Sequence, residues 1–296
     1  MRERERIKQN LKNLFKNLFY NLLLTLNKLK TFNLITKRIF NLHLIEEGYC
    51  VDWNFLINKS QINLFLGENI FIKKFNKLNI ANCLDIVANI GEFSTQILLN
   101  KNTNVIAFEP LPDCCERLAI IEKNSNGRFK YYQNALSNSE KIDYLFFGKN
   151  TSGLASLETV INDIPYVKES NKNKIQVVIK KFNNFLDNNN FKNIDFIKID
   201  VKGHEMSVIE GGLEFIKKNN VKLIQMEFNW HNLMMNQSIY NYSKIFNTYI
   251  TTRLNLINGK LKIVDPKDFM SNIYHLSNYI FVQKEFFDKN AELLIN

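Results

Sequence analysis

The sequence has few glycine, proline and cysteine residues. It contains 10 glycines and 4 prolines among 296 residues, which excludes collagen-like and linker-rich architectures. Its cysteines, Cys50, Cys83, Cys114 and Cys115, include no C-x-x-C spacing, which excludes the common zinc and disulfide frameworks and suits a reducing compartment. What it does have is 24 Phe, 11 Tyr and 45% hydrophobic residues, enough for a large globular core.

Positive charge is concentrated at the N-terminus. Residues 1–40 contain ten Lys or Arg and two Asp or Glu, a net charge of +8, whereas residues 41–296 carry only +2. A protein that modifies nucleic acid is expected to have basic residues around its active site. The distribution of positive charge therefore argues against a nucleic-acid partner.

The basic N-terminal segment has the periodicity of an amphipathic helix. Its uncharged stretch covers only residues 17–27, and a bilayer span needs about 20 mostly apolar residues. Two interpretations fit: a helix that lies on an anionic membrane face, or a helix that packs on the domain with its lysines in water. We expect residues 1–40 to form this extension, 41–79 a lead-in that packs on the domain, and 80–296 the domain itself. The expected location is the cytoplasm, peripheral to the inner membrane face under the first interpretation.

From about residue 80, continuous apolar runs alternate with helical patterns. Runs of this kind indicate strands covered on both faces of a parallel sheet. Near the C-terminus, Asn258-Gly259 between two apolar runs predicts a type I′ hairpin. The predicted fold is α/β: a doubly wound, mostly parallel Rossmann-like sheet with a C-terminal antiparallel addition and an N-terminal helical extension. Strands are expected over 80–88, 105–109, 129–135, 142–147, 175–181, 194–201, 223–228 and 279–282, and helices over 91–99, 112–124, around Phe185 and over 204–218.

Two neighbouring strand ends carry an acid, at the edge where such sheets bind ligands. Asp85 precedes a turn of small residues that enters a helix at Gly91, and Glu109 ends the next strand. Because the turn lacks the glycines of the dinucleotide fingerprint, a nicotinamide-dependent oxidoreductase is disfavoured. The pattern suits S-adenosylmethionine, with Asp85 at its ammonium group and Glu109 at its ribose hydroxyls.

Four segments together resemble the FkbM-type methyltransferase family, over about residues 80–228. They are Asp-Ile-Val-Ala-Asn-Ile-Gly-Glu-Phe-Ser from Asp85, Phe-Glu-Pro-Leu-Pro from Phe108, Asn-Ala-Leu-Ser from Asn134, and Ile-Lys-Ile-Asp-Val-Lys-Gly-His-Glu from Ile197. The resemblance implies an S-adenosylmethionine-dependent O-methyltransferase that acts on sugar or secondary-metabolite hydroxyls. It also implies that the cofactor is lined by Asp85, Ala88, Asn89, Gly91 and Glu109, with Asn134 and Ala135 beside the adenine.

The sequence departs from the family pattern at two positions. The family has Gly where Val87 stands and Glu where Lys202 stands. A β-branched residue restricts that turn, and Lys202 reverses a charge beside the presumed reaction centre. An alternative function is therefore a catalytically degenerate binding or scaffold protein on the same fold.

The acceptor is expected at the end of the strand that reaches Asp200. Methyl transfer to a hydroxyl needs a group that removes its proton, and Asp200 and His204 are the candidates, with Glu205 to orient a partner. Glu227 and Asn229 are candidates for acceptor hydroxyls, and Trp230 for a stacking face. Four of these residues also have a purely structural interpretation. His204 would face solvent, Glu205 would interact favourably with the dipole of the helix that begins there, and Glu227 and Trp230 would lie at the edge of the core.

No spacing on one element gives the geometry of a metal site, so no metal is predicted. The predicted activity is S-adenosylmethionine-dependent O-methylation of a hydroxyl on a sugar, glycan or glycolipid precursor.

Overall fold

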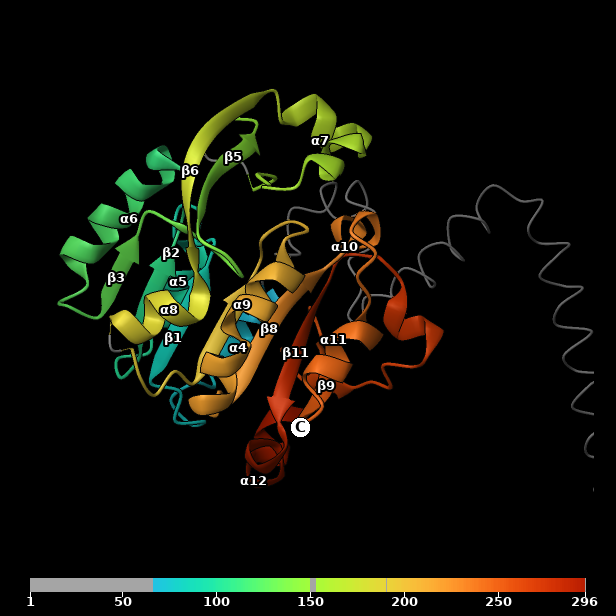
Figure 1. The fold of residues 1–296 in the computed structure, drawn as a ribbon. Coiled ribbons are helices and arrows are strands. Elements are labelled where there is room, and N and C mark those ends of the chain that lie inside the picture. The colour runs from blue at the N-terminus through green and yellow to red at the C-terminus, as the bar shows by residue number, and fades with distance from the viewer. Residues whose placement is uncertain (1–65, 150–152, 190, 296) are drawn as a thin grey trace, which may run out of the picture.

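A computed structural model describes residues 66–149, 153–189 and 191–295 (Figure 1). The predictions for residues 1–40 and for most of the 41–79 lead-in lie outside the described residues. The described end of the lead-in forms helix α4 (Leu66–Ile72), whose Phe71 and Ile72 are buried against the domain.

The main sheet has eight strands in the order β10-β9-β11-β8-β7-β1-β2-β3. Its five parallel strands are β3 (Phe129–Tyr132), β2 (Asn104–Phe108), β1 (Asn82–Ile86), β7 (Phe196–Ile199) and β8 (Leu223–Phe228). The C-terminal addition is antiparallel, as predicted, and consists of β11 (Ser277–Gln283), β9 (Tyr249–Leu254) and β10 (Leu261–Ile263).

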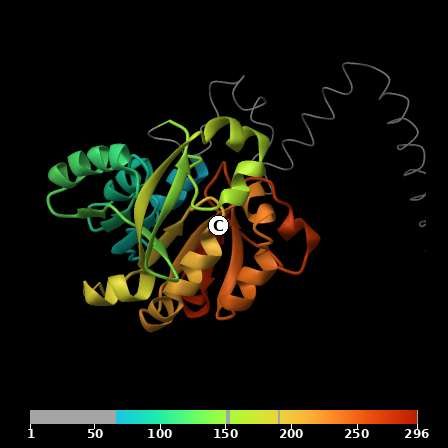
Figure 2. The same cartoon turned by 45° about the horizontal axis from the view of Figure 1, so that its top comes forward.

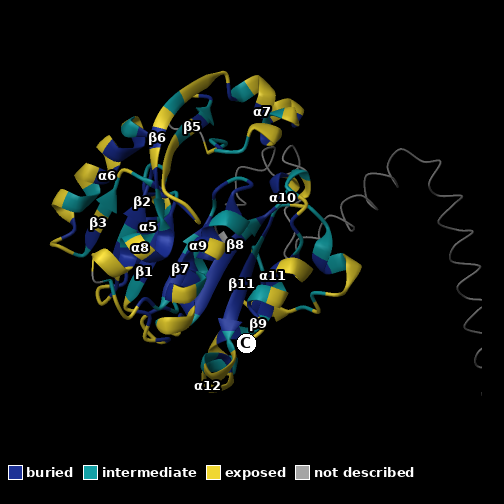
Figure 3. Ribbon diagram, viewed as in Figure 1, coloured by how far each residue is buried: buried dark blue, intermediate teal, exposed yellow. Residues whose placement is uncertain are grey.

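Apolar side chains from both faces of the sheet form two buried clusters, so the central strands are covered on both sides (Figure 3). One cluster includes Ile197 and Val208, which joins helix α9 (Glu205–Lys218) to the sheet, and the other includes Phe196 and Ile97, which joins α5 (Glu92–Leu98). The remaining helices are α6 (Pro112–Asn124), α7 (Pro165–Ser170), α8 (Phe182–Asn188), α10 (Trp230–Met234), α11 (Ile239–Ile245) and α12 (Lys284–Ile295), with short 3-10 turns η1 (Thr159–Asp163) and η2 (Phe269–Asn272).

The expected strand over 129–135 is wrong as one element. The chain turns after β3, where the Asn134 amide donates to the carbonyl of Tyr132 at 2.9 Å, and β4 (Ala135–Ser137) joins a second sheet. This small sheet has the order β4-β6-β5, with β5 (Lys141–Phe147) and β6 (Asn173–Lys181) antiparallel. Together with α7 it lies beyond the carboxyl ends of the parallel strands (Figures 1 and 2).

The C-terminal hairpin forms, but its predicted two-residue type I′ turn is wrong. Leu254 pairs with Leu261, so residues 255–260 form a wider loop. The Asn255 side chain accepts from the amides of Ile257 and Asn258, and the Gly67 amide of α4 donates to Leu256 at 2.8 Å. Helix α4 therefore holds the loop open, a long-range contact that a local turn pattern does not contain.

Candidate active site

A small pocket lies where the parallel strands end. The main sheet contributes Val87, Glu109, Pro110, Val201 and His204, and the second sheet with its loop contributes Ala135, Leu136, Leu145, Ala155, Ser156 and Leu157. The pocket therefore has a floor from one sheet and a roof from the other. Three predicted site residues, Glu109, Ala135 and His204, are brought together here from distant parts of the chain.

Asp85 is fully buried on β1 and is incompletely hydrogen-bonded. The Ser94 hydroxyl donates to its Oδ2 at 2.6 Å, whereas its Oδ1 is buried without a partner in the described part of the chain. Burial raises the pKa of this carboxyl, and Lys198, which pairs with it in register on β7, opposes the rise. A buried polar atom without a partner is rare in a folded protein. Oδ1 is thus a chemically suitable acceptor for the ammonium group of S-adenosylmethionine.

Glu109 joins two turns of the pocket. Its Oε2 accepts from the Asn89 amide at 2.8 Å and its Oε1 from the Leu111 amide at 2.9 Å. Burial raises its pKa to about 7, against the opposing effect of these two amides. Each carboxylate oxygen retains a second lone pair. The residue therefore fits the ribose hydroxyls, as a side chain already fixed by the backbone.

The β1–α5 turn contains three left-handed residues: Val87 with φ 67°, Asn89 with φ 51° and Gly91 with φ 82°. Gly91 is favoured by its positive φ, and an added Cβ would also displace the Ile121 side chain, whose Cδ1 would lie 2.4 Å away. Val87 is β-branched, and holding it in this region costs about 1–2 kcal/mol. Its side chain both packs on the core and lines the pocket.

Two other predicted cofactor residues lie beside the pocket. Ala88 is buried in the apolar cluster under the turn, and its amide donates to Phe108. Asn134 is half-buried and directly precedes Ala135, which lines the pocket. The cofactor roles of Ala88 and Asn134 stay predictions.

His204 is buried and held at both ring nitrogens, so the solvent-facing alternative is wrong. Its Nδ1 lies 2.6 Å from Glu158 Oε1 and its Nε2 lies 2.9 Å from Ser137 Oγ. These contacts tie the start of α9 to β4 and to the loop before η1. Because both ring nitrogens are engaged, His204 holds the pocket wall in place, and its role as the base stays a prediction.

A line of charged side chains runs across the ends of β7 and β8. Lys202 Nζ lies 2.6 Å from Asp200 Oδ1 and 2.6 Å from Glu227 Oε1, and Lys198 Nζ lies 3.3 Å from Asp200 Oδ2. Burial favours a higher pKa for Asp200, but Lys202 and Lys198 hold it well below its ordinary value. Burial and repulsion by Asp200 raise the pKa of Glu227 despite Lys202. Glu227 is therefore the stronger base of the two.

The Glu205 side chain is buried, and its hydrogen bonds go to groups other than the His204 ring. It accepts from the Gly203 amide, at 3.0 Å to Oε2, and from Asn232 Nδ2 at 3.2 Å. Burial raises its pKa to about 7. The group that orients His204 is Glu158, which lies 46 positions away in the sequence.

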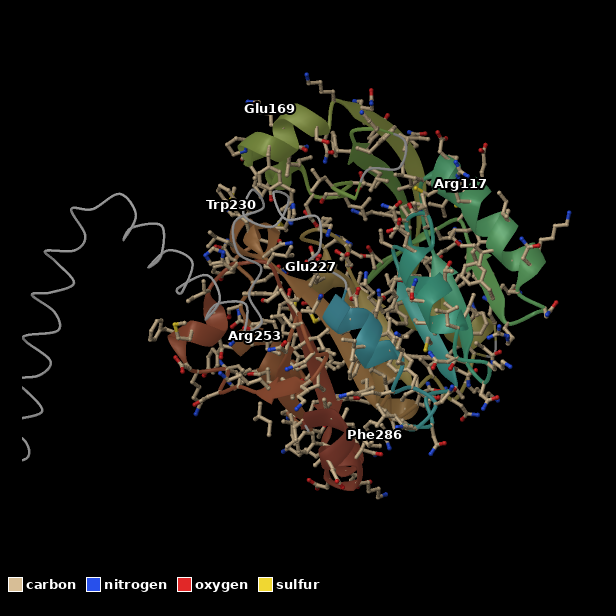
Figure 4. The ribbon with its side chains drawn as sticks, turned by 180° about the vertical axis from the view of Figure 1, so that it is seen from behind. Arg117, Glu169, Glu227, Trp230, Arg253 and Phe286 are labelled. Carbon is tan, nitrogen blue, oxygen red and sulfur yellow. The ribbon has the colours of Figure 1, made fainter. Side chains whose placement is uncertain are left out.

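The predicted acceptor residues divide into one buried contact and one exposed surface. Asn229 donates to Glu227 Oε1 at 2.7 Å and accepts from the His231 amide at 2.8 Å, so its side chain is occupied within the protein. Trp230 is 43% exposed and pairs with Tyr166 of α7, which is 44% exposed, at 6.0 Å between ring centroids. Figure 4 shows Trp230 and Glu227 at the same end of the sheet.

Sequence reasoning missed Lys198, Glu158, Ser137 and Tyr166. Only Lys198 has a local signal, because a lysine inside the apolar run 194–201 requires a buried partner.

Within the described ranges, no three His, Cys, Asp or Glu side chains converge as metal ligands. The helices that the structure describes include none long and apolar enough to span a bilayer.

The chain is similar to several solved methyltransferases at low sequence identity. A putative caffeoyl-CoA O-methyltransferase from Staphylococcus aureus is 14% identical, with 90% of this chain and 99% of that one covered and a TM-score of 0.41. An O-methyltransferase from Bacillus cereus in complex with SAH is 11% identical over 78% of this chain and 87% of that one, with a TM-score of 0.39. No curated protein matches the sequence.

A family model matches over more than half of the chain. The model describes the methyltransferase FkbM domain, and the match covers residues 85–247, which include Asp85, Lys202 and Glu227. The resemblance inferred from the four sequence segments is thereby confirmed. The chain belongs to the FkbM methyltransferase family and is an S-adenosylmethionine-dependent methyltransferase.

Proposed function

We propose that the protein methylates a hydroxyl group of a sugar, within a glycan or glycolipid precursor. When bound, S-adenosylmethionine supplies a methyl group that its sulfonium already activates. The protein's own residues have to hold the donor, position the acceptor oxygen and take its proton. On this proposal Asp85 binds the donor's ammonium group and Glu109 its ribose.

The observation that supports a sugar acceptor is the Tyr166–Trp230 pair beside Glu227. Lys202 and Glu227 both influence the pKa of Tyr166, which burial raises, so the aromatic pair and the charged line share one region. Sugars present C–H faces that stack on aromatic rings and hydroxyls that donate to carboxylates. An exposed aromatic pair next to ion-paired carboxylates offers both kinds of contact.

The test is transfer of labelled methyl from S-adenosylmethionine to glycan and lipid extracts. We expect label in a carbohydrate fraction, as a methyl ether that resists mild alkali. Trp230→Ala is expected to lower the rate at limiting acceptor, while Leu233→Ala is the matched control because Leu233 is 45% exposed on the same helix. Label in a protein or nucleic-acid fraction would contradict the proposal.

Val87 favours a second candidate, a degenerate binding protein on the same fold. Its strained turn narrows the pocket where the family has glycine. Calorimetry separates the two functions. Micromolar binding of S-adenosylmethionine supports the enzyme, and no binding to the folded protein supports the degenerate module.

A further inference from the structure

Lys202 lies where the acids at two neighbouring strand ends converge. Its ammonium is 2.6 Å from a carboxylate oxygen of Asp200, after β7, and 2.6 Å from one of Glu227, on β8. The Lys202 side chain is only 13% exposed. Two carboxylates that meet on one buried positive centre form a cation site, and here the cation is covalently part of the chain.

The backbone around Lys202 is fixed on both sides. Lys202 has φ 49°, in the left-handed region, where strain tends to accumulate at functional sites. Its carbonyl accepts from the Ser156 hydroxyl at 2.7 Å, and the next carbonyl, of Gly203, accepts from Gln237 at 2.9 Å. The strained turn is therefore held by contacts from the pocket roof and from the segment after α10.

The ammonium has capacity beyond its two ion pairs. Burial favours a lower pKa for Lys202, but the Asp200 and Glu227 carboxylates raise it well above its ordinary value, so the group stays charged. An ammonium has three N–H donors. The ammonium donates to Glu227 Oε1 at 2.6 Å and forms an ion pair with Asp200 at 2.6 Å, and it has no further partner among the residues that the structure describes.

We propose that Lys202 is the resident cation of the acceptor site: it fills the place of a divalent ion between Asp200 and Glu227, and its third N–H donates to the acceptor oxygen. The inference rests on the proposed function for the identity of that oxygen. As the oxygen lone pair forms the bond to the methyl carbon, the pair of the breaking methyl–sulfur bond stays on sulfur. The hydroxyl proton passes to Glu227 Oε2, which has no partner within the described ranges.

Reversing the charge at position 202 tests whether Lys202 occupies a cation site. Lys202→Glu removes the ammonium and places a third carboxylate beside Asp200 and Glu227. Three carboxylates on one centre are a suitable ligand set for a hard divalent cation such as Mn²⁺ or Mg²⁺. The variant is therefore expected to acquire a metal requirement that the natural protein does not have.

The experiment titrates Mn²⁺ into the full-length protein and its variants, followed by calorimetry and by the electron paramagnetic resonance of bound Mn²⁺. Lys202→Glu is expected to bind one Mn²⁺ per chain and to melt at a higher temperature with it. Adding Asp200→Asn to that variant removes the site. The matched control is Lys222→Glu, because Lys222 pairs with Asp195 at 2.7 Å at the opposite end of the strands. The natural protein and the Lys222→Glu control are expected to bind no Mn²⁺ at Asp200. Adding Asp200→Asn to either of them should therefore leave its Mn²⁺ titration unchanged.

Transfer assays with the acceptor fraction test the catalytic role. Lys202→Met is expected to lower kcat by about 100-fold, the usual effect of losing one donor to a developing oxyanion, while the affinity for S-adenosylmethionine is kept. Lys202→Glu is expected to recover transfer only when Mn²⁺ or Mg²⁺ is added. A merely structural lysine would not give rescue by a metal ion.

The inference is overturned if Lys202→Glu binds no Mn²⁺ under conditions where it is folded, or if the natural protein binds Mn²⁺ through Asp200. If Lys202→Glu folds only when Mn²⁺ is present, that gain of structure reports the same cation site and supports the inference. Failure of the natural protein to bind S-adenosylmethionine would refute the proposed function alone, because the Mn²⁺ titration requires neither donor nor acceptor.

Discussion

The Ser94 hydroxyl lies 2.6 Å from Asp85 Oδ2, so the opposite oxygen of this fully buried carboxylate is left without a partner in the described chain. Ser94 is on α5 and Asp85 on β1, and the pair thus links the two elements that flank the pocket turn. One hydrogen bond fixes the carboxylate orientation and leaves the second oxygen without a partner, beneath the turn that lines the pocket.

Asp85→Asn is expected to weaken S-adenosylmethionine binding by about 10- to 100-fold, since a hydrogen bond to a charged group is worth about 1.5–3 kcal/mol. The demethylated product has the same ammonium group, so calorimetry should show an equal loss for both ligands. Ser94→Ala is the control: it removes the orienting donor but keeps the charge, and its effect should be smaller. Unchanged affinity in Asp85→Asn would contradict the assigned contact.

Val87→Gly is expected to tighten S-adenosylmethionine binding by about tenfold, or about 1.4 kcal/mol. The substitution relieves the left-handed strain of Val87 and removes a side chain that lines the pocket. Its stability should change little, because the strain relief of about 1–2 kcal/mol is offset by lost burial and by the greater backbone freedom of glycine. Val87→Ala, which keeps a Cβ in the strained turn, should gain less. Weaker binding by Val87→Gly would show that the valine contacts the donor favourably.

The central strands could be predicted from the sequence because most of their residues are buried. The run 223–228 coincides with β8, and the run 194–201 contains β7, which is two residues shorter at each end. The rule that ligands bind at the carboxyl ends of parallel strands then selected Glu109, which lines the pocket, and Asp85, which is buried on the neighbouring strand. These predictions depend on residues within one element and on the order of elements, and both are present in the sequence.

The contacts made by the acids could not be predicted in this way. Lys202 reaches Glu227 only because β7 and β8 are neighbours and because its backbone turns left-handed. His204 meets Glu158 through the roof segment, whose position depends on the second sheet. The chain turns at Asn134, and this turn splits the expected strand 129–135 and places β4 in the second sheet. The spacing of apolar residues does not predict this turn.

Stability is expected to fall as pH rises from about 4.5 to about 7. Burial raises the pKa values of Glu68, Glu109 and Glu205 to about 7, so the folded state binds more protons than the unfolded state in this window. An excess of protons on the folded state makes the free energy of unfolding decrease with pH. His231 acts in the opposite direction within this window, because burial lowers its pKa to about 4, but it is one group against three. Asp200 also acts in the opposite direction, but only below the pKa of about 4 that it has when unfolded.

Urea denaturation at about pH 5.5 and about pH 8 measures this difference. The protein should be more stable at the lower pH by a few kcal/mol, and Glu205→Gln should reduce the difference because it removes one of the three groups. Glu116→Gln, at an exposed position on α6, should leave it unchanged. Greater stability at the higher pH would show that these glutamates are charged in the folded protein.

Deleting residues 1–30 is expected to abolish binding to vesicles that contain anionic lipid and to leave S-adenosylmethionine affinity unchanged. The deletion removes eight Lys or Arg residues, and attraction of such a segment to a charged surface is screened as salt increases. Sedimentation with vesicles at low and high salt measures the binding. A full-length variant with Gln at Lys12, Lys16, Lys28 and Lys30 keeps the apolar positions and should lose most of the salt-sensitive part. If the protein that lacks residues 1–30 aggregates while the glutamine variant stays monomeric, the N-terminal segment packs on the domain and the membrane proposal fails.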